Sequence, residues 1–217
     1  MEFDFSPVIT YAPTLMKGVW VTFLIALVVG IFSIVGGLLV AVISIFTNKV
    51  VSWPLRFFIW LFMTTPLLLQ LYFLYFGLGE WILIPALMVG VLGLGFHYMA
   101  YNADIFMATM RSVSSGQYEA SRSLGFGHVR TIYYIIVPQA FIRSVPQIGN
   151  NLILMVKDTS VLSAIGVAEL VYASQYAISV SFRPFEFFIV IAVIYYILNL
   201  FMEYGQARFE RMTADRR

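Results

Sequence analysis

Long stretches without a charged side chain limit most strictly how this chain can fold. Residues 19–46 form 28 consecutive uncharged positions, more than the roughly 20 that a helix needs to cross a bilayer core. Residues 57–79, 81–103 and 187–202 form similar runs, and residues 144–168 are apolar apart from Lys157 and Asp158. The pattern predicts an all-α integral membrane protein, a single domain over residues 1–217 with five spans at about 15–46, 56–78, 82–111, 138–160 and 186–207.

Composition removes several functional classes. The chain is 61% hydrophobic and 11% charged, whereas soluble proteins are roughly 45–50% apolar and 25% charged. It has no cysteine, which excludes disulfides and thiolate sites, and a net charge of +2 is too small to indicate nucleic-acid binding. None of the lysines at 17, 49 and 157 follows glycine, as the lysine of an ATP-binding loop does. His97 and His128 are isolated and are interpreted as structural, so we expect no enzyme, no metal and no cofactor on this chain.

The distribution of Lys and Arg predicts the orientation in the membrane. Five spans put the two ends of the chain on opposite sides, and basic residues gather on the cytoplasmic side. One side holds 10 of the 13 basic residues: Lys49, Arg56, Arg111, Arg122, Arg130, Arg143, Arg208, Arg211, Arg216 and Arg217. The acidic start, residues 1–4, lacks the positive region of a signal peptide, so the first apolar run must direct insertion. We expect the N-terminus outside and the C-terminus in the cytoplasm.

A polar loop at residues 112–137 interrupts the apolar chain on that cytoplasmic side. Ser114, followed three residues later by Gln117, predicts a helix start with a capping box, and Gly125 supplies the left-handed residue that ends a helix. A second short helix is expected from 128 to 136, and Pro138 suits the first turn of the helix that follows. Two short helices meeting at a glycine corner would form a compact knob.

A helix break is predicted in the second span. Pro66 has no N–H and therefore frees the carbonyl of Phe62 near the bilayer midplane, about 15 Å from Arg56. Transporters often bind solutes at such breaks, and Gln70 adds a polar group one turn further. A packing kink satisfied by the hydroxyl of Thr64 or Thr65 is the alternative reading.

Ionisable residues inside the predicted spans are the other candidates for a site. Asp104 lies about 10 Å inside the membrane, with Asn102 beside it, and is either functional or a buried structural partner. Lys157 and Asp158 lie about 21 Å from Arg143 and point about 100° apart, so they cannot pair side by side. One could face a solute path while the other caps a broken helix. Alternatively, Lys157 extends outward and Asp158 caps the turn at Thr159.

The order and spacing of several motifs resemble the membrane subunits of bacterial ABC importers, in the branch that takes up polar amino acids. Over roughly residues 14–210 the matching segments are Glu119-Ala120-Ser121 with Gly125, Ile135 and Val137-Pro138, Thr65-Pro66-Leu67-Leu68 with Gln70, Tyr101 to Phe106, Pro138-Gln139-Ala140, and Lys157 to Ser160. This resemblance implies a permease subunit in the bacterial inner membrane that imports a polar amino acid or a related compound such as an opine.

The resemblance also implies partners. Glu119, Ala120, Ser121, Gly125 and Pro138 would couple the knob to a separate ABC ATPase homodimer, which binds ATP and Mg²⁺. A second copy or a paralogous permease would enclose the path, and a periplasmic amino acid-binding protein would deliver the solute. Met63-Thr64 stands where the family commonly has Arg-Gly, which removes a positive charge near the break.

An amino acid zwitterion needs an acceptor for its ammonium group and a donor for its carboxylate. We expect Asp104 and the segment that contains Thr64, Thr65, Pro66 and Gln70 to line the pocket, with Asn102 nearby and the Phe62 carbonyl as a second acceptor. Lys157 and Asp158 would lie nearer the outer gate.

A secondary transporter or channel acting alone is the main alternative, but the knob pattern occurs once and five spans do not divide into equal repeats. A purely structural scaffold would not require the interior charges.

Overall fold

The computed structural model describes residues 3–214, and every regular element in that range is helical, which confirms the predicted all-α class. The predicted roles of residues 1 and 2 and of Arg216 and Arg217 lie outside the described residues. The helices in order are α1 (Ser6–Phe46), α2 (Lys49–Thr64), α3 (Leu67–Tyr72), α4 (Ala86–Arg111), α5 (Ser115–Ser123), α6 (His128–Thr131), α7 (Val137–Asp158), α8 (Leu170–Ser181) and α9 (Pro184–Ala214).

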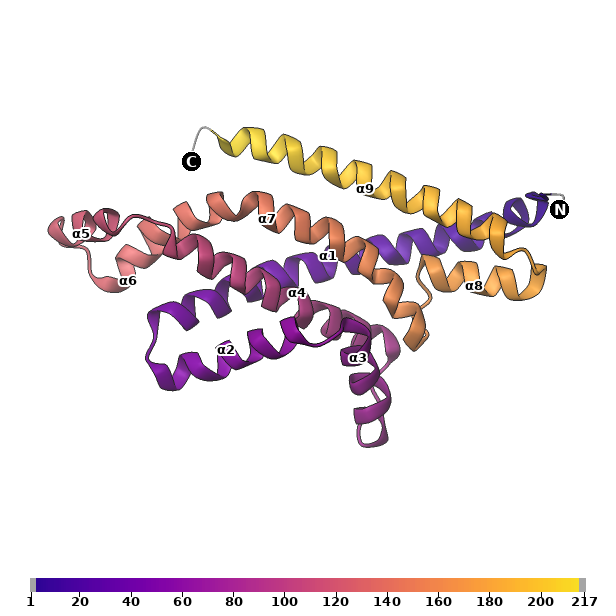
Figure 1. Ribbon diagram of the computed structural model, residues 1–217, viewed down its shortest axis with the longest axis horizontal. Helices are drawn as coiled ribbons and strands as arrows, with labels where there is room; N and C mark the ends of the chain where they lie inside the picture. Colours follow the sequence, from indigo (N-terminus) through magenta and orange to yellow (C-terminus); the bar gives the residue numbers. More distant parts are fainter. Residues whose placement is uncertain (1–2, 215–217) are drawn as a thin grey trace.

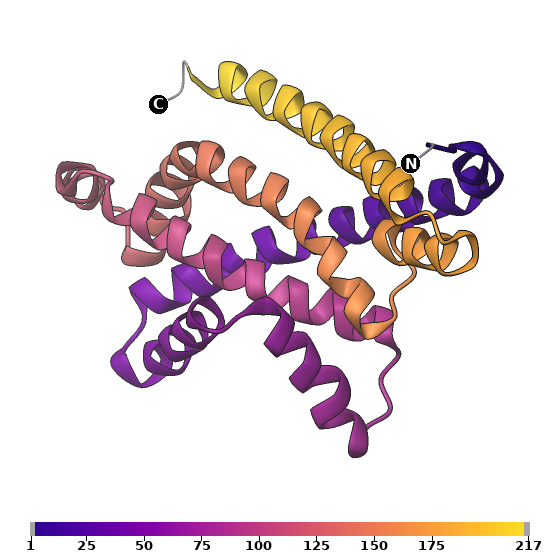
Figure 2. The same cartoon turned by 45° about the vertical axis from the view of Figure 1, so that its right-hand side comes forward.

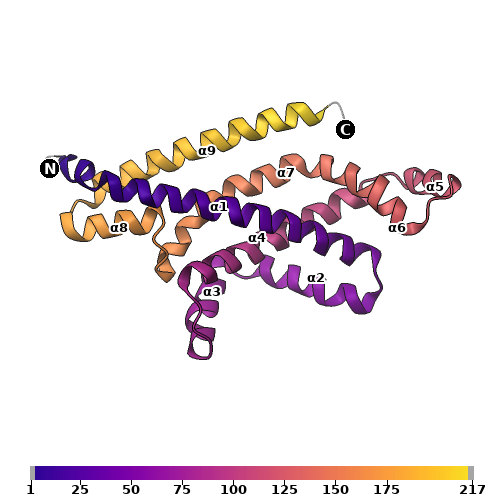
Figure 3. The ribbon, with the colours of Figure 1, turned by 180° about the vertical axis from the view of Figure 1, so that it is seen from behind.

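The two ends of the molecule carry different segments. Figure 1 shows α5, α6, the α1–α2 connection and the end of α9 at one end, and the start of α1 with α8 at the other. α1 has 41 residues and is about 60 Å long, roughly twice the thickness of a bilayer core. Seen from behind, it runs across α4 and α7 for most of the length of the molecule (Figure 3).

Glycines bring α1 close to its neighbours. A Cβ on Gly37 would lie 2.9 Å from the Asn102 Cβ and 3.0 Å from the Ala103 backbone nitrogen, so the backbones of α1 and α4 almost touch. A Cβ on Gly30 would lie 3.3 Å from the Leu152 side chain of α7. These contacts place α1 against two helices at once.

The range predicted as the second span is not one straight helix. α2 ends at Thr64, and the segment from Leu67 to Glu80 leaves it at a bend of 111°. This second arm begins as α3 and continues through π-helical and 3-10 turns. Figure 1 shows it projecting away from the body, which is centred on α4.

The range predicted as the fourth span is α-helical almost to its end, and the chain bends only beyond it. α7 ends at Asp158 and continues as a 3-10 helix over Thr159–Ile165, and α8 then turns away by 49°. The departure from a straight α-helix therefore begins at Asp158, next to Lys157.

By length and composition, α1 and α9 are suited to crossing a membrane, and up to four crossings result if each bent pair is one span. α4, which carries His97, Asn102 and Asp104, is not among these candidates. The fifth crossing and the orientation stay predictions.

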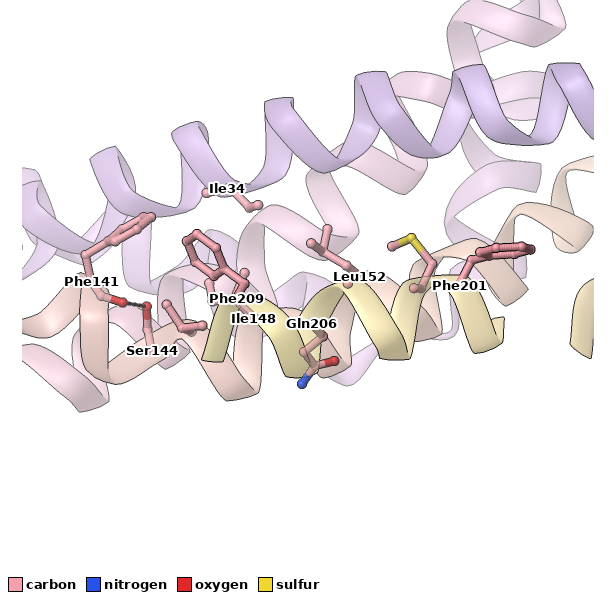
Figure 4. Close-up of a pocket in the computed structure, with 12 residues that line it drawn as sticks. Ile34, Phe141, Ser144, Ile148, Leu152, Phe201, Gln206 and Phe209 are labelled. Carbon is pink, nitrogen blue, oxygen red and sulfur yellow. Dashed lines mark hydrogen bonds between the residues drawn. The ribbon is translucent and has the colours of Figure 1, made fainter. Parts of the chain in front are cut away.

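α9 packs on α7 and α8 but meets α1 at few positions, and Figure 2 shows it standing apart from the body. A cavity of about 410 Å³ lies between α1, α7 and α9. Its wall is formed mostly by apolar side chains, among them Ile34, Ile148, Leu152 and Phe201 (Figure 4). Because this cavity separates the two helices, α9 lies beside α1 without a continuous helix–helix interface.

Candidate functional site

The break between α2 and α3 is capped by side chains of its own segment. The Thr64 hydroxyl donates to the Trp60 carbonyl at 2.7 Å, and the Thr65 hydroxyl donates to the Leu61 carbonyl at 2.7 Å. Pro66 begins the second arm with φ −62° and ψ 135°. The hydroxyl capping that was one reading of the sequence is therefore present.

The Phe62 carbonyl, which the sequence predicts to be a free acceptor, is occupied. Gln70 Nε2 donates to it at 2.9 Å and also lies 3.0 Å from the Thr65 carbonyl and 2.7 Å from the Thr65 hydroxyl. The carbonyl is therefore not a free acceptor, because the Gln70 amide reaches back over the break and donates to it. Its role in solute binding stays a prediction, since a carbonyl oxygen has a second lone pair.

His97 completes the arrangement from α4. Its Nδ1 lies 3.1 Å from Gln70 Oε1, and its side chain is 8% exposed. An amide oxygen only accepts hydrogen bonds, so His97 Nδ1 carries the proton in this pair. Sequence reasoning assigned His97 a structural role but did not find its partner, because 27 residues separate the two side chains and no local pattern joins them.

Asp104 and Asn102 have different surroundings, although the sequence grouped them together. Asp104 is exposed, and within residues 3–214 its carboxylate has no hydrogen-bond or ion-pair partner. Asn102 is 1% exposed, donates to Ser33 of α1 at 3.2 Å and accepts from Asn151 of α7 at 3.1 Å. The structure does not support direct solute contact by Asn102, since both ends of its amide join helices inside the subunit.

Lys157 and Asp158 do not form a pair, as the sequence predicts. Lys157 is exposed, whereas Asp158 accepts a hydrogen bond of 2.7 Å from the hydroxyl of Tyr98 on α4. The alternative in which the Asp158 side chain caps the turn at Thr159 is wrong, because that carboxylate makes no capping bond there. Tyr98 holds Asp158 against α4 and leaves Lys157 as the outward-facing charge.

Glu169 is a buried acid that sequence reasoning did not single out. It is 0% exposed and accepts hydrogen bonds from the backbone N–H groups of Val171 and Tyr172 at 2.9 and 2.8 Å, and from the Tyr195 hydroxyl at 3.1 Å. It therefore caps α8 and ties it to α9. An acid directly before an apolar helical stretch was the available signal.

The knob has the predicted glycine corner. Gly125 has φ +83°, and the Phe126 N–H donates to the Ser121 carbonyl while the Gly125 N–H donates to the Arg122 carbonyl, both at 3.0 Å. These two bonds form the Schellman ending of a helix. Ser114 caps α5 as predicted, through the N–H of Gly116 at 3.3 Å. The capping box does not form, because the Gln117 side chain accepts from Gln139 at 3.4 Å instead.

The second predicted helix of the knob is not a separate element. α6 covers only His128–Thr131 and passes through a π-helical turn directly into α7, with Pro138 in the first turn of α7 as expected. Two contacts hold α5 against this segment. The Tyr118 hydroxyl lies 2.8 Å from His128 Nδ1, and the buried hydroxyls of Ser121 and Thr131 are 2.9 Å apart.

The outer surface of the knob combines one acid with apolar side chains. Glu119, Ala120, Gly125 and Pro138 are exposed. Ser121, predicted as a coupling residue, is only 4% exposed and points into the knob, so it supports the surface rather than forming it. Leu124 and Val129 are 78% and 77% exposed.

These features define an all-helical protein with long apolar helices, a compact polar loop and a sharp bend between α2 and α3. Residues 33–214 match the family described as binding-protein-dependent transport system inner membrane component, and the chain belongs to this family.

Relatives cover almost the whole chain. It is 33% identical to the probable amino-acid permease protein YxeN of Bacillus subtilis, over 96% of this chain and 95% of that protein. It is 32% identical to the glutamine transport system permease protein GlnP of Escherichia coli K12, over 97% and 98% of the two chains. A solved structure described as an amino acid ABC transporter with histidines has a TM-score of 0.90 and 34% identity, covering 98% of this chain and 100% of that one.

Proposed function

We propose that this chain is the permease subunit of an ABC importer that takes up a polar amino acid, or a related compound such as an opine, across the bacterial inner membrane. Family membership and the near-complete match to amino-acid permeases support the transport class. The single observation that carries the solute class is Asp104, an exposed carboxylate of α4 that has no hydrogen-bond or ion-pair partner within residues 3–214 and lies inside the membrane in the topology proposed below. An ionisable side chain in such a position requires a charged ligand, water or a partner subunit.

The proposed topology has five crossings, with the N-terminus periplasmic and the C-terminus cytoplasmic. The spans lie at about 15–46, 56–78, 82–111, 138–160 and 186–207 of one transmembrane domain, with the coupling loop at 112–137. The end of the molecule that carries the knob also carries Lys49, Arg56 and most of the arginines of residues 3–214. This grouping supports a cytoplasmic knob.

The proposed partner of the knob is an ABC ATPase homodimer that binds ATP and Mg²⁺ itself. The charge of Glu119 can attract the ATPase and orient it, and the exposed Leu124 and Val129 offer apolar contact area. The bonds of Tyr118 and Ser121 to the α6 segment make the knob a firm extension of α7. Movement of the ATPase would therefore reach the helix that carries Lys157 and Asp158.

A second permease subunit, either another copy or a paralogue, would cover Asp104 and complete the path, and a periplasmic amino acid-binding protein would deliver the solute. Asp104 lies seven residues from His97 on the same face of α4, which is the side that meets the break. We assign Asp104 to the solute ammonium group. Thr64, Thr65, Pro66 and Gln70 shape the neighbouring wall, and Lys157 with Asp158 lies about 9 Å further out, at the level of Tyr98.

The hollow in the bend itself is an unsuitable place for the charged groups of the solute. It has a volume of about 510 Å³ and is lined mainly by apolar side chains such as Leu61, Phe62, Leu69 and Phe73. A zwitterion held there without hydrogen-bond partners would lose several kcal/mol of solvation. Apolar parts of the solute or of the second subunit fit this surface better.

Reconstitution tests the function. The chain, its ATPase and its binding protein are placed in lipid vesicles, and ATP-dependent uptake of labelled amino acids and opines is measured against an ATPase variant that cannot hydrolyse ATP. Glu119→Lys is compared with Glu119→Gln, and only the charge reversal is expected to abolish ATPase binding. Uptake that needs no ATPase would favour the solitary transporter and would contradict the proposal.

A further inference from the structure

Two consecutive residues of α4 reach two places where a neighbouring α-helix ends, which we call the helix interruptions. His97 contacts Gln70, which caps the break between α2 and α3. Tyr98 contacts Asp158, the last residue of α7 before its 3-10 continuation. Successive positions on a helix point about 100° apart, so one turn of α4 serves both neighbours.

The Gln70 amide can perform its role in one orientation only. Its nitrogen faces three acceptors, the carbonyls of Phe62 and Thr65 and the Thr65 hydroxyl oxygen, at 2.7–3.0 Å. Rotating the amide by 180° would direct its oxygen at two carbonyl oxygens. The His97 Nδ1–H is the only donor that Gln70 Oε1 meets within residues 3–214, and it selects the productive orientation.

Tyr98 has the corresponding effect on the other side. Its ring is 5% exposed, and its hydroxyl lies 2.7 Å from Asp158 Oδ2. This bond directs the Asp158 carboxylate toward α4. A single phenolic hydroxyl therefore ties the end of α7 to α4, while the neighbouring Lys157 stays exposed.

We propose that His97 and Tyr98 are positioning residues that lock both helix interruptions to α4 and thereby set the shape of the solute site. His97 acts through Gln70 and Tyr98 acts through Asp158, and neither needs to touch the solute. Asp104 stands on the same helix, so all three elements of the site share α4 as a common support. The effect on solute binding rests on the proposed function. The two contacts, His97 with Gln70 and Tyr98 with Asp158, do not depend on it.

The variants separate the hydrogen bonds from the packing. His97→Leu removes the donor, whereas His97→Asn keeps an N–H on the atom that replaces Nδ1. Tyr98→Phe removes only the hydroxyl. Tyr196→Phe is the matched control, since Tyr196 is 65% exposed on α9 and its hydroxyl makes no hydrogen bond within the described residues.

Backbone hydrogen exchange is measured first, on the assembled complex without solute. His97→Leu is expected to accelerate exchange in residues 61–70, and Tyr98→Phe in residues 156–163, each without effect on the other segment. His97→Asn and Tyr196→Phe are expected to match the wild type. Wild-type exchange in His97→Leu, or equal acceleration in His97→Asn, would overturn the proposal, because the donor would then not be the cause.

Solute-stimulated ATP hydrolysis is measured second. The solute concentration for half-maximal stimulation is expected to rise about two- to tenfold in His97→Leu and Tyr98→Phe, the usual effect of one lost hydrogen bond. Basal and maximal hydrolysis should stay at wild-type values, which a general loss of stability would not allow. If solute stimulates the wild type and both variants need the same solute concentration for half-maximal stimulation, the proposal is overturned. A wild type that no amino acid stimulates would instead contradict the proposed function, and hydrogen exchange would still decide the role of the two residues.

Discussion

Asn102 and Asp104 lie two positions apart on α4, yet one is enclosed between three helices and the other faces outward. Their depth along the helix axis follows from 1.5 Å per residue, and the sequence predicted it. Their direction around the axis was not predictable, because apolar residues surround both and no amphipathic pattern distinguishes the faces of this helix. The structure supplies the missing direction through Ser33 and Asn151.

Asp104→Asn is expected to weaken solute binding without preventing assembly. It keeps the size of the side chain but loses an ionic hydrogen bond, which typically costs about 1.5–3 kcal/mol, or roughly ten- to more than a hundredfold in apparent affinity. The measurement is the solute concentration for half-maximal uptake or stimulated ATP hydrolysis. The loss should be larger for a cationic solute, and an assembled variant with unchanged solute dependence would show that Asp104 is structural.

Asn102→Leu should have the opposite profile. It removes two hydrogen bonds between helices, each worth about 0.6 kcal/mol on average and up to about 1.7 within membranes. We expect a lower melting temperature and a lower yield of the detergent-purified complex, with an unchanged solute concentration for half-maximal stimulation in the protein that remains. If Asn102→Leu raised the solute concentration for half-maximal stimulation as much as Asp104→Asn does, Asn102 would have to contact the solute.

Among the elements, those marked by local chemistry were predicted well. Gly125 and Ser114 fixed the limits of α5, and Pro66 fixed the break in the second span. The sequence did not predict the direction of the 111° bend or the Gln70–His97 contact, since both depend on packing between segments far apart in the chain. The continuity of α6 with α7 was missed for a similar reason, because a π-helical turn has no strong sequence signal.

Gly125→Val tests the knob as an element. A non-glycine residue in the left-handed region costs roughly 1–2 kcal/mol, and a β-branched residue costs more. The corner should therefore distort and bind the ATPase less well. Gly116→Ala is the matched control in α5, because its added Cβ would meet only the Ser114 Oγ at 3.5 Å, an ordinary contact. Co-purification of the ATPase is the measurement, and equal recovery with both variants would contradict the docking role of this corner.

For the whole molecule, the absence of cysteine makes the orientation directly measurable. Gly127→Cys and Glu80→Cys introduce thiols at exposed positions on either side of α4. Because α4 crosses the membrane between them in the proposed topology, we expect an impermeant reagent to label Gly127→Cys from the cytoplasm and Glu80→Cys from outside. Labelling of both from one side would overturn the five-span topology.

The exposure of Asp104 has a consequence for biosynthesis. A chain that has been inserted but has not met its partner presents an ionisable group about 10 Å inside the bilayer, which costs a few kcal/mol relative to water. Proteases that survey the membrane for misplaced polar groups would thus have a recognisable mark on every unassembled copy. We expect surplus chains to be degraded faster than chains in complexes, and Asp104→Leu to lengthen the half-life of the surplus chain in a pulse–chase measurement. A carboxylate proposed to bind the solute would then also control the stoichiometry of the transporter.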